Sequence, residues 1–242
     1  MLSIALALVL AQAAVCTGKS GASVASAQSR ADAFNLVAAA AAFESAVAAG
    51  CPQARLPALY LRGWLAARDA YRFGGSPESV APVRKVLDDL DALPPDAAGE
   101  GEIARFVLRA AIAAAQSERD EMSLLIEHAI TLEARRRAAS LPGAPVITAH
   151  EAAGDLWLQV HRYDDASRAY ARAAERIGPT RRITLGLARA AVRMSDTATA
   201  CANYRALIDA WRVKEDAAEL AEARTFVRQR SCDSTTGANR PQ

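Results

Sequence analysis

The second half of the chain repeats a pattern of small and aromatic residues with a period of 34, the distance from Tyr170 to Tyr204. The first copy is Ile147–Thr180, and the second begins at Arg181. Corresponding residues are Gly154 and Ala188, Ala166 and Ala200, Tyr170 and Tyr204, and Ala173 and Leu207. A fixed period of this length is typical of arrays of helix pairs, in which no pair can bury its apolar face alone. The repeat therefore predicts stacked antiparallel helices.

Small and large residues alternate in these copies as close helix packing requires. Gly154 and Ala188 let one helix of each pair approach its partner closely, and Ala166 and Ala200 do the same on the second helix. The tyrosine four residues after each of these alanines fills the space beside it. The turns at His161–Asp164 and Ser195–Thr197 offer capping oxygens where the second helix of each pair would begin. An ordinary helical bundle with a coincidental period is the alternative.

The first copy has small or aromatic residues where tetratricopeptide repeats place them: Gly154, Trp157, Tyr163, Ala166, Tyr170 and Ala173. It closely resembles a tetratricopeptide repeat, and the second copy is similar at Leu187, Ala188, Ala200, Tyr204 and Leu207. Both depart from the family where it favours a final proline, because Gly178-Pro179 comes one position late and the second copy has none. The resemblance implies an all-α fold, a tetratricopeptide-like α-solenoid of antiparallel helix pairs with a C-terminal capping helix.

The rest of the chain fits the same plan less regularly. Residues 147–214 form the two units, 215–231 the capping helix and 232–242 a disordered tail. Residues 31–140 are interpreted as degenerate helical hairpins. The expected helices there are Ala31–Ala49, Leu56–Arg72, Pro77–Leu93, Glu102–Gln116 and Asp120–Arg137. A boundary near 140–146 would separate two halves, but a continuous array is favoured.

The N-terminus has the pattern of a targeting signal. Leu2–Val15 is uncharged and almost entirely apolar, too short for a comfortable membrane span and suited to a signal-peptide core. We expect residues 1–13 to be the signal peptide, with Ala11–Ala13 as the cleavage site and a second candidate as late as residue 27. Residues 14–30 then form a flexible spacer, and the protein is exported to the periplasm or cell envelope. A short buried helix is the alternative.

Four cysteines bear on this expectation. Cys16 follows the apolar stretch as a lipidated cysteine would, but Ala13 and Val15 match the lipoprotein pattern poorly. Thiols of exported proteins tend to pair. Antiparallel helices place Cys201, early in one helix, near Cys232, at the end of the next, which predicts a disulfide between them. Cys51 has a retained Cys16 as its only remaining partner.

No motif for catalysis, cofactor binding or metal binding occurs. The three histidines, His128, His150 and His161, lack metal-site spacing, and there is no phosphate loop, dinucleotide fingerprint or nucleophile elbow. We therefore predict no catalytic residue, no cofactor and no metal ligand. The net charge of +2, with acids and bases interspersed, gives no basic footprint for nucleic acid.

One set of polar residues is a candidate binding site. Arg182, Arg189 and Arg193 fall within about 40° of one helix face. The corresponding helix of the preceding unit offers Glu151, Asp155 and Gln159. The resemblance implies that this face lines a concave groove that reads an extended peptide or a partner helix, and arginines there suit a carboxylate. In the alternative, Arg182 and Arg189 pair only with the neighbouring Glu151 and Asp155.

These observations favour a non-enzymatic adaptor that binds a protein or peptide partner in the groove. A second candidate is a membrane-anchored subunit of an envelope assembly, similar to a lipoprotein. A third, an enzyme or a sugar-binding helical repeat, would need a pocket with convergent polar groups, and no cluster in the sequence points to one. In either case, contact with the membrane is expected only through an uncleaved or lipidated N-terminal segment.

Overall fold

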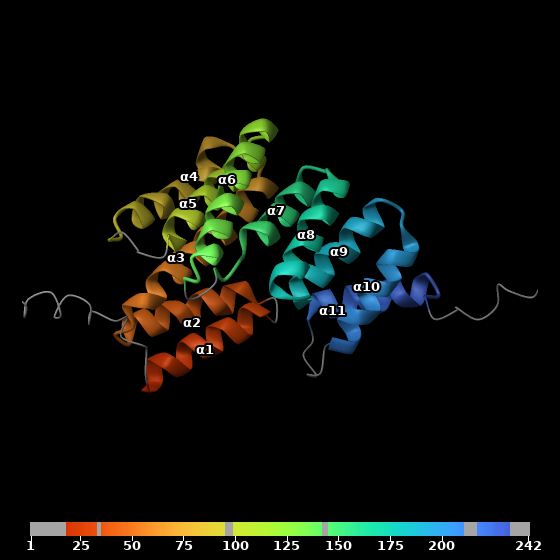
Figure 1. Ribbon diagram of the computed structural model, residues 1–242, viewed down its shortest axis with the longest axis horizontal. Helices are drawn as coiled ribbons and strands as arrows, with labels where there is room; N and C mark the ends of the chain where they lie inside the picture. Colours follow the sequence, from red (N-terminus) through yellow and green to blue (C-terminus); the bar gives the residue numbers. More distant parts are fainter. Residues whose placement is uncertain (1–17, 33–34, 95–98, 142–144, 211–216, 233–242) are drawn as a thin grey trace, which may run out of the picture.

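A computed structural model of the protein describes residues 18–32, 35–94, 99–141, 145–210 and 217–232. These residues form eleven α-helices and one short 3-10 helix and include no strand, so the fold is all-α as predicted. In chain order (Figure 1) the elements are α1 (Gly18–Asp32), α2 (Leu36–Ala48), η1 (Pro52–Ala54), α3 (Arg55–Arg72), α4 (Pro77–Asp91), α5 (Glu100–Ala115), α6 (Arg119–Ala138), α7 (Ala149–Gln159), α8 (Tyr163–Ile177), α9 (Arg181–Arg193), α10 (Thr197–Ala210) and α11 (Ala218–Gln229).

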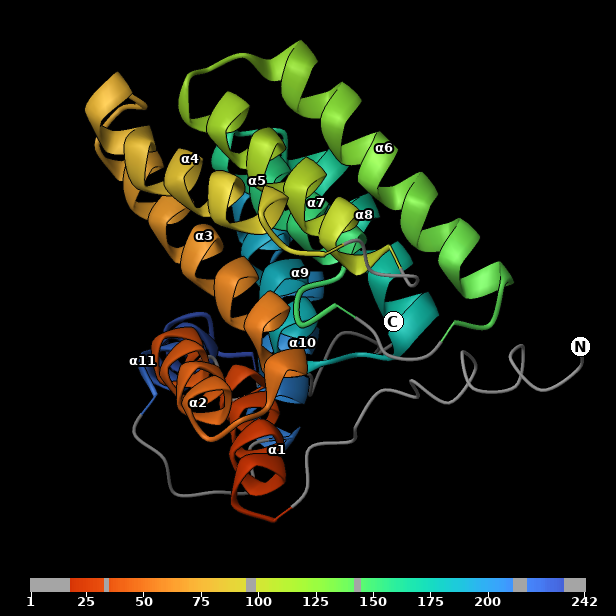
Figure 2. The same ribbon diagram turned by 90° about the vertical axis from the view of Figure 1, so that its left-hand side faces the viewer.

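Helices that follow one another in the chain pack side by side. The pairs are α1 with α2, α3 with α4, α5 with α6, α7 with α8, and α9 with α10, and α11 packs on α10. The first helices of successive pairs also touch, α3 against α5, α5 against α7 and α7 against α9. Figures 1 and 2 both show α1 and α2 below the layer formed by α3 to α6. One row of helices, α3, α5, α7 and α9, therefore runs through the molecule.

Both repeat units begin with a threonine cap. The Thr148 hydroxyl accepts from the Glu151 N–H at 3.3 Å, and the Thr180 hydroxyl accepts from the Ile183 N–H at 3.3 Å. An oxygen at this position satisfies one of the N–H groups that a helix start leaves unpaired. The same local chemistry thus sets the first residues of α7 and α9.

The turns inside the two units share a backbone conformation. His161 and Ser195, equivalent by the repeat, both adopt a left-handed conformation, with φ of 63° and 62°. The second turn is capped as predicted, because Asp196 Oδ1 accepts from the Thr199 N–H at 3.0 Å. The first turn differs, since Arg162 stands at the start of α8 and provides no side-chain cap.

Tyr170 on α8 fills the junction of α7, α8 and α9. Its side chain is 1% exposed. A Cβ at Gly154 would lie 2.6 Å from its ring, and a Cβ at Gly186 would clash with the same ring. The predicted close approach at Gly154 is therefore present, with Gly186 as the second small residue. Ala188, the equivalent of Gly154 in the second unit, packs with Tyr204, the equivalent of Tyr170, in the next cluster of buried residues.

The structure corrects the predicted flexible spacer and the first predicted helix. Residues 18–30 are part of helix α1, not a spacer, and Ala27 and Ala31 are buried in the core at 0% and 2% exposure. The expected helix Ala31–Ala49 is divided, because α1 ends at Asp32 and Asn35 caps a new helix by accepting from the Ala38 N–H. Residues 1–17, including the predicted signal peptide and Cys16, lie outside the described residues, as does the tail after Cys232.

A disulfide joins Cys201 on α10 to Cys232 just after α11, with 5.5 Å between their Cα atoms. This is the pairing that the antiparallel helices predict. The crosslink spans 31 residues of chain and ties the end of α11 to the second repeat unit. Cys51, 1% exposed at the end of the α1–α2 pair, is also disulfide-bonded.

Replacing Cys201 and Cys232 together with serine is expected to lower the free energy of unfolding by about 3–4 kcal/mol, from the loop-closure entropy of a link of this length. Urea unfolding followed by circular dichroism measures the change. The double substitution isolates this crosslink, whereas a reductant would also break the bond of Cys51. An unchanged unfolding midpoint would show that the bond does not stabilise the fold.

Candidate binding groove

Arg182 and Glu151, two of the predicted groove residues, form a buried ion pair between α9 and α7. Arg182 Nε lies 2.6 Å from Glu151 Oε1, and their side chains are 13% and 3% exposed. Arg182 Nη2 also donates to the Val146 carbonyl at 2.7 Å. Burial raises the pKa of Glu151 to about 7, against the lowering effect of Arg182. This pair joins the two repeat units, which is the alternative weighed from the sequence.

Arg189 has a different partner from the one expected. It donates to Glu222 of α11 through Nε at 3.0 Å and Nη2 at 2.6 Å, and the Tyr204 hydroxyl donates to the same carboxylate at 2.7 Å. Burial raises the pKa of Glu222. The hydrogen bonds from Arg189 and Tyr204 outweigh burial and hold that pKa below its ordinary value. Asp155, the neighbour expected for Arg189, instead accepts from the Tyr170 hydroxyl. Burial raises the pKa of Asp155.

Glu222 is a residue that the sequence did not single out. It lies on α11, outside the repeat, so no 34-residue correspondence points to it. The only available signal is the helical spacing of Glu219 and Glu222, three residues apart on one face of α11.

Two cavities of about 200 and 390 Å³ share Leu158, Gln159 and Arg189 and form one continuous surface, here named the central groove. It is lined by α3, α7 and α9 and closed by side chains of α2, α10 and α11. The residues used below are Arg68, Tyr71, Leu158, Gln159, Arg189, Val192 and Arg193. Three of the four helices in the row, α3, α7 and α9, thus line a hollow surface.

The central groove contains two exposed cations with no ion pair or hydrogen bond in the described part of the chain, Arg68 on α3 and Arg193 on α9. Arg193 belongs to the predicted set. Arg68 was missed, because the looser upstream pattern gave no basis for aligning α3 with the repeat units. Tyr71 of α3 donates its hydroxyl to the Gln159 carbonyl, which fixes α3 against α7 along the groove floor.

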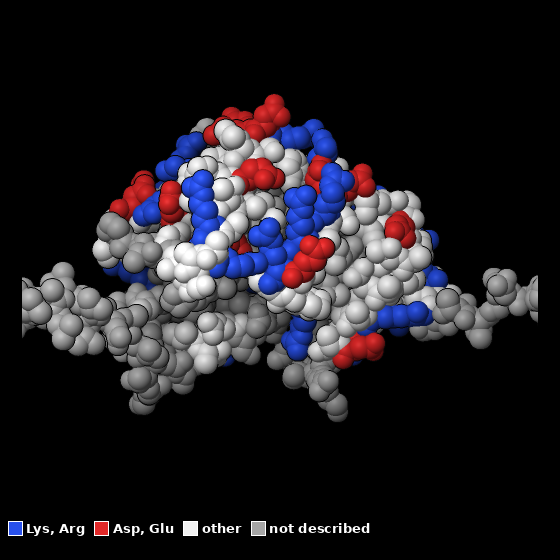
Figure 3. All heavy atoms as spheres, in the orientation of Figure 1, with Lys and Arg blue, Asp and Glu red and all other residues white. Residues whose placement is uncertain are grey.

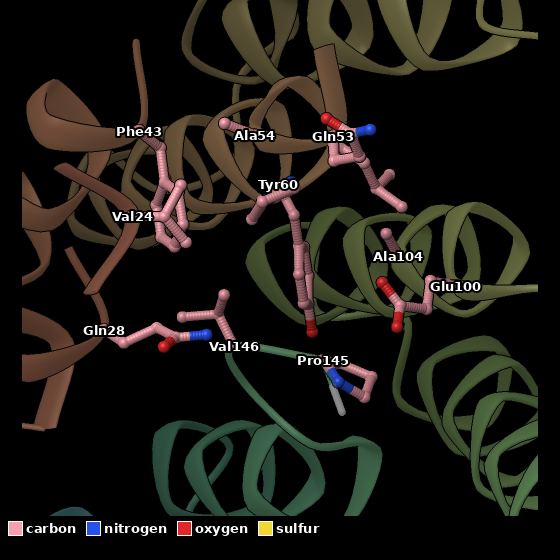
Figure 4. A pocket seen from close by; sticks show the side chains of 12 residues that line it. Val24, Gln28, Phe43, Gln53, Ala54, Tyr60, Glu100, Ala104, Pro145 and Val146 are labelled. Carbon is pink, nitrogen blue, oxygen red and sulfur yellow. The ribbon is translucent and has the colours of Figure 1, made fainter. Parts of the chain in front are cut away.

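A separate cavity of about 210 Å³ lies where α1, α2, α3 and α5 meet the segment before α7 (Figure 4). Its walls include Val24, Phe43 and Tyr60, and Figure 4 shows the Tyr60 hydroxyl directed toward Pro145 and Val146. That hydroxyl donates to the Ile147 carbonyl at 3.1 Å. Burial raises the pKa of Tyr60 well above its ordinary value, so the phenol stays neutral. The contact joins the first helices to the start of the repeat.

The described residues contain no group of three or more histidine, cysteine, aspartate or glutamate side chains placed to hold a metal ion. Among the same residues, no helix has the length and apolar character needed to cross a membrane.

Comparison with known proteins gives no match, since no family model, no curated protein and no solved structure is significantly similar to this chain.

Proposed function

We propose that the protein is a tetratricopeptide-like adaptor that binds a peptide or helix of another protein in the central groove. The observation that carries the proposal is the row of first helices, α3, α7 and α9, whose facing side chains form one continuous hollow surface. Helical repeat arrays bind partners on surfaces of this kind. The proposed role is non-enzymatic, in keeping with the engagement of two acidic groups of the groove, Asp155 by Tyr170 and Glu222 by Arg189.

The charges of the groove favour a partner segment with acidic residues. Arg182 and Arg189 hold partners of their own, so the cations left for a ligand are Arg68 and Arg193. They stand on α3 and α9, on either side of α7, and their guanidinium groups suit carboxylates. Val192, 36% exposed, and Leu158 provide apolar contact between them. We infer an extended or helical segment with two acidic positions flanking an apolar residue.

Export to the periplasm or cell envelope is part of the proposal. Its support is the Cys201–Cys232 disulfide together with the disulfide-bonded Cys51. Structural disulfides persist in oxidising compartments and are rare in the cytosol. Cell fractionation with detection of the mature protein tests this part.

Replacing Arg68 and Arg193 together with glutamate is expected to reduce capture of the partner at least about tenfold, because each change replaces an attraction with a repulsion. The measurement is affinity capture from an envelope extract with quantitative mass spectrometry of the retained proteins. Arg84→Glu on α4, an exposed arginine outside the groove, is the matched control and should retain the partner. Equal recovery on the double variant and the control would reject the groove as the binding surface.

A further inference from the structure

A further cavity, of about 370 Å³, lies between α6, α7 and α8. Helix α7 contributes His150, Ala153 and Trp157 to it, residues spaced three and four apart on one helix face. The central groove takes Asp155, Leu158 and Gln159 from the opposite face of the same helix. The cavity is therefore independent of the groove, and its volume falls within the range of about 300–1,000 Å³ that small-molecule sites occupy.

Arginines line this cavity from two sides. Arg119 begins α6, and Arg162, Arg168 and Arg172 come from the start and body of α8. Figure 3 shows basic side chains gathered over α6 and α8 on this face. Arg162, at 2.7 Å, and Arg168 share one carboxylate, that of Asp165. Two positive charges, those of Arg162 and Arg168, thus share a single negative charge.

Arg119 and Arg172 are the two cavity arginines without an ion-pair or hydrogen-bond partner in the described ranges, and both are exposed. Two other acids, Asp120 and Glu127, line the α6 wall, so four guanidinium groups face three carboxylates. A bound cation would meet this excess of positive charge. An oxyanion placed between α6 and α8 would meet the two arginines that lack partners.

His150 adds a buried polar group that lacks a partner. Its side chain is 3% exposed, and neither Nδ1 nor Nε2 has a hydrogen-bond partner. Most buried polar groups in folded proteins are hydrogen-bonded, so an unsatisfied one needs an explanation. Burial and then Arg176, Arg172 and Arg137 lower the pKa of His150 to about 4, so the ring is neutral and offers one N–H donor. Three arginines lie close enough to disfavour its protonation, and none of the carboxylates that line the cavity accepts from the ring.

We propose that this cavity binds a small oxyanion, a phosphate or carboxylate group, between Arg119 on α6 and Arg172 on α8, with the His150 imidazole donating from the cavity wall. The planar guanidinium fork matches either kind of oxyanion with two parallel hydrogen bonds. Both arginines are long, flexible and exposed, so closing on a ligand requires only rotation of their side chains. The negative charge of the oxyanion would offset the positive charge of the nearby arginines, which contributes to the low pKa of His150.

The test uses the full chain with inorganic phosphate and citrate as probes, followed by nuclear magnetic resonance of the imidazole resonances and by calorimetry. We expect at least one probe to bind with a Kd below about 1 mM. The His150 resonances should shift on binding, and its pKa should rise above its value in the free protein. Arg119→Gln and Arg172→Gln should each weaken binding about tenfold. Arg224→Gln, an exposed arginine on α11, is the control and should leave binding unchanged.

The outcomes separate the two sources of the oxyanion. Tighter binding of phosphate assigns the site to a phosphate group, and tighter binding of citrate assigns it to a polycarboxylate. Absence of binding by both probes overturns the proposal. So does binding that is equal in the two cavity variants and in Arg224→Gln, or binding that leaves the His150 resonances unmoved, because the anion would then lie elsewhere.

Discussion

Replacing Arg182 with methionine is expected to lower the free energy of unfolding by about 3–5 kcal/mol, the usual cost of removing one partner of a buried ion pair. Within the described ranges, Arg182 is the one cation paired with the Glu151 carboxylate, which is 3% exposed. The substitution keeps an unbranched apolar side chain and removes the guanidinium group with its charge. It also deprives the Val146 carbonyl of its donor. Glu151 would then either bury its charge without a counterion or take up a proton, depending on the pH.

The loss should grow as the pH rises. Burial raises the pKa of Glu151 to about 7 from 4.5, and Arg182 opposes that rise. A carboxyl group with a higher pKa in the folded state takes up a proton on folding, so stability is greatest below the unfolded pKa and falls as the pH rises through the folded pKa. Without Arg182 the folded pKa moves higher. The deficit of Arg182→Met should therefore be smaller at about pH 5 than at about pH 8.

Two controls separate this effect from a general loss of charge. Arg62→Met breaks an exposed pair with Asp89, 2.6 Å apart with side chains 46% and 35% exposed, and should cost under about 1 kcal/mol. Arg182→Met combined with Glu151→Leu removes both buried charges and should recover much of the loss. Urea unfolding at both pH values measures all the variants. A deficit for Arg182→Met no larger than that for Arg62→Met would contradict the account.

The 34-residue period predicts features whose causes are local. Tyr170 is buried because its helix face is set by spacing alone. Thr148 and Thr180 cap their helices because a cap depends on a few adjacent residues, although the period does not relate these two positions. His161 and Ser195 share a left-handed turn for the same reason, although no glycine marks either position. Local pattern also brings Cys201 and Cys232 together, since one short connection between adjacent helices determines their distance.

Features that depend on contacts between distant segments were not predictable in the same way. Arg189 pairs with Glu222 rather than Asp155, because Tyr170 occupies Asp155 and α11 brings a second carboxylate to the groove. Helix α1 is rich in serine and glycine, which are poor helix formers. It is helical because Ala27 and Ala31 are buried against the rest of the core, a tertiary effect that composition does not reveal. Arg68 belongs to the candidate site because α3 lies beside α7, a contact between distant segments.

Replacing Tyr170 with alanine is expected to cost about 3–5 kcal/mol, as for other fully buried aromatic side chains. The ring fills the space between Gly154 on α7 and Gly186 on α9, where neither glycine has a side chain that can occupy the cavity left behind. The Asp155 carboxylate would also lose its hydroxyl donor. Because the substitution removes the contact shared by three helices, it should weaken the packing between the repeat units as well as the helix that carries it.

Tyr170→Phe separates packing from hydrogen bonding. It keeps the ring and should cost only about 1–3 kcal/mol, the penalty for leaving the buried Asp155 oxygen without its partner. Tyr163→Ala, on the same helix but only half-buried, is the control and should cost far less than Tyr170→Ala. Unfolding monitored by hydrogen exchange measures the change for each helix. If Tyr170→Ala left the protection of α7 and α9 unchanged, the ring would be a local filler and the two units would be held together chiefly by the Arg182–Glu151 pair.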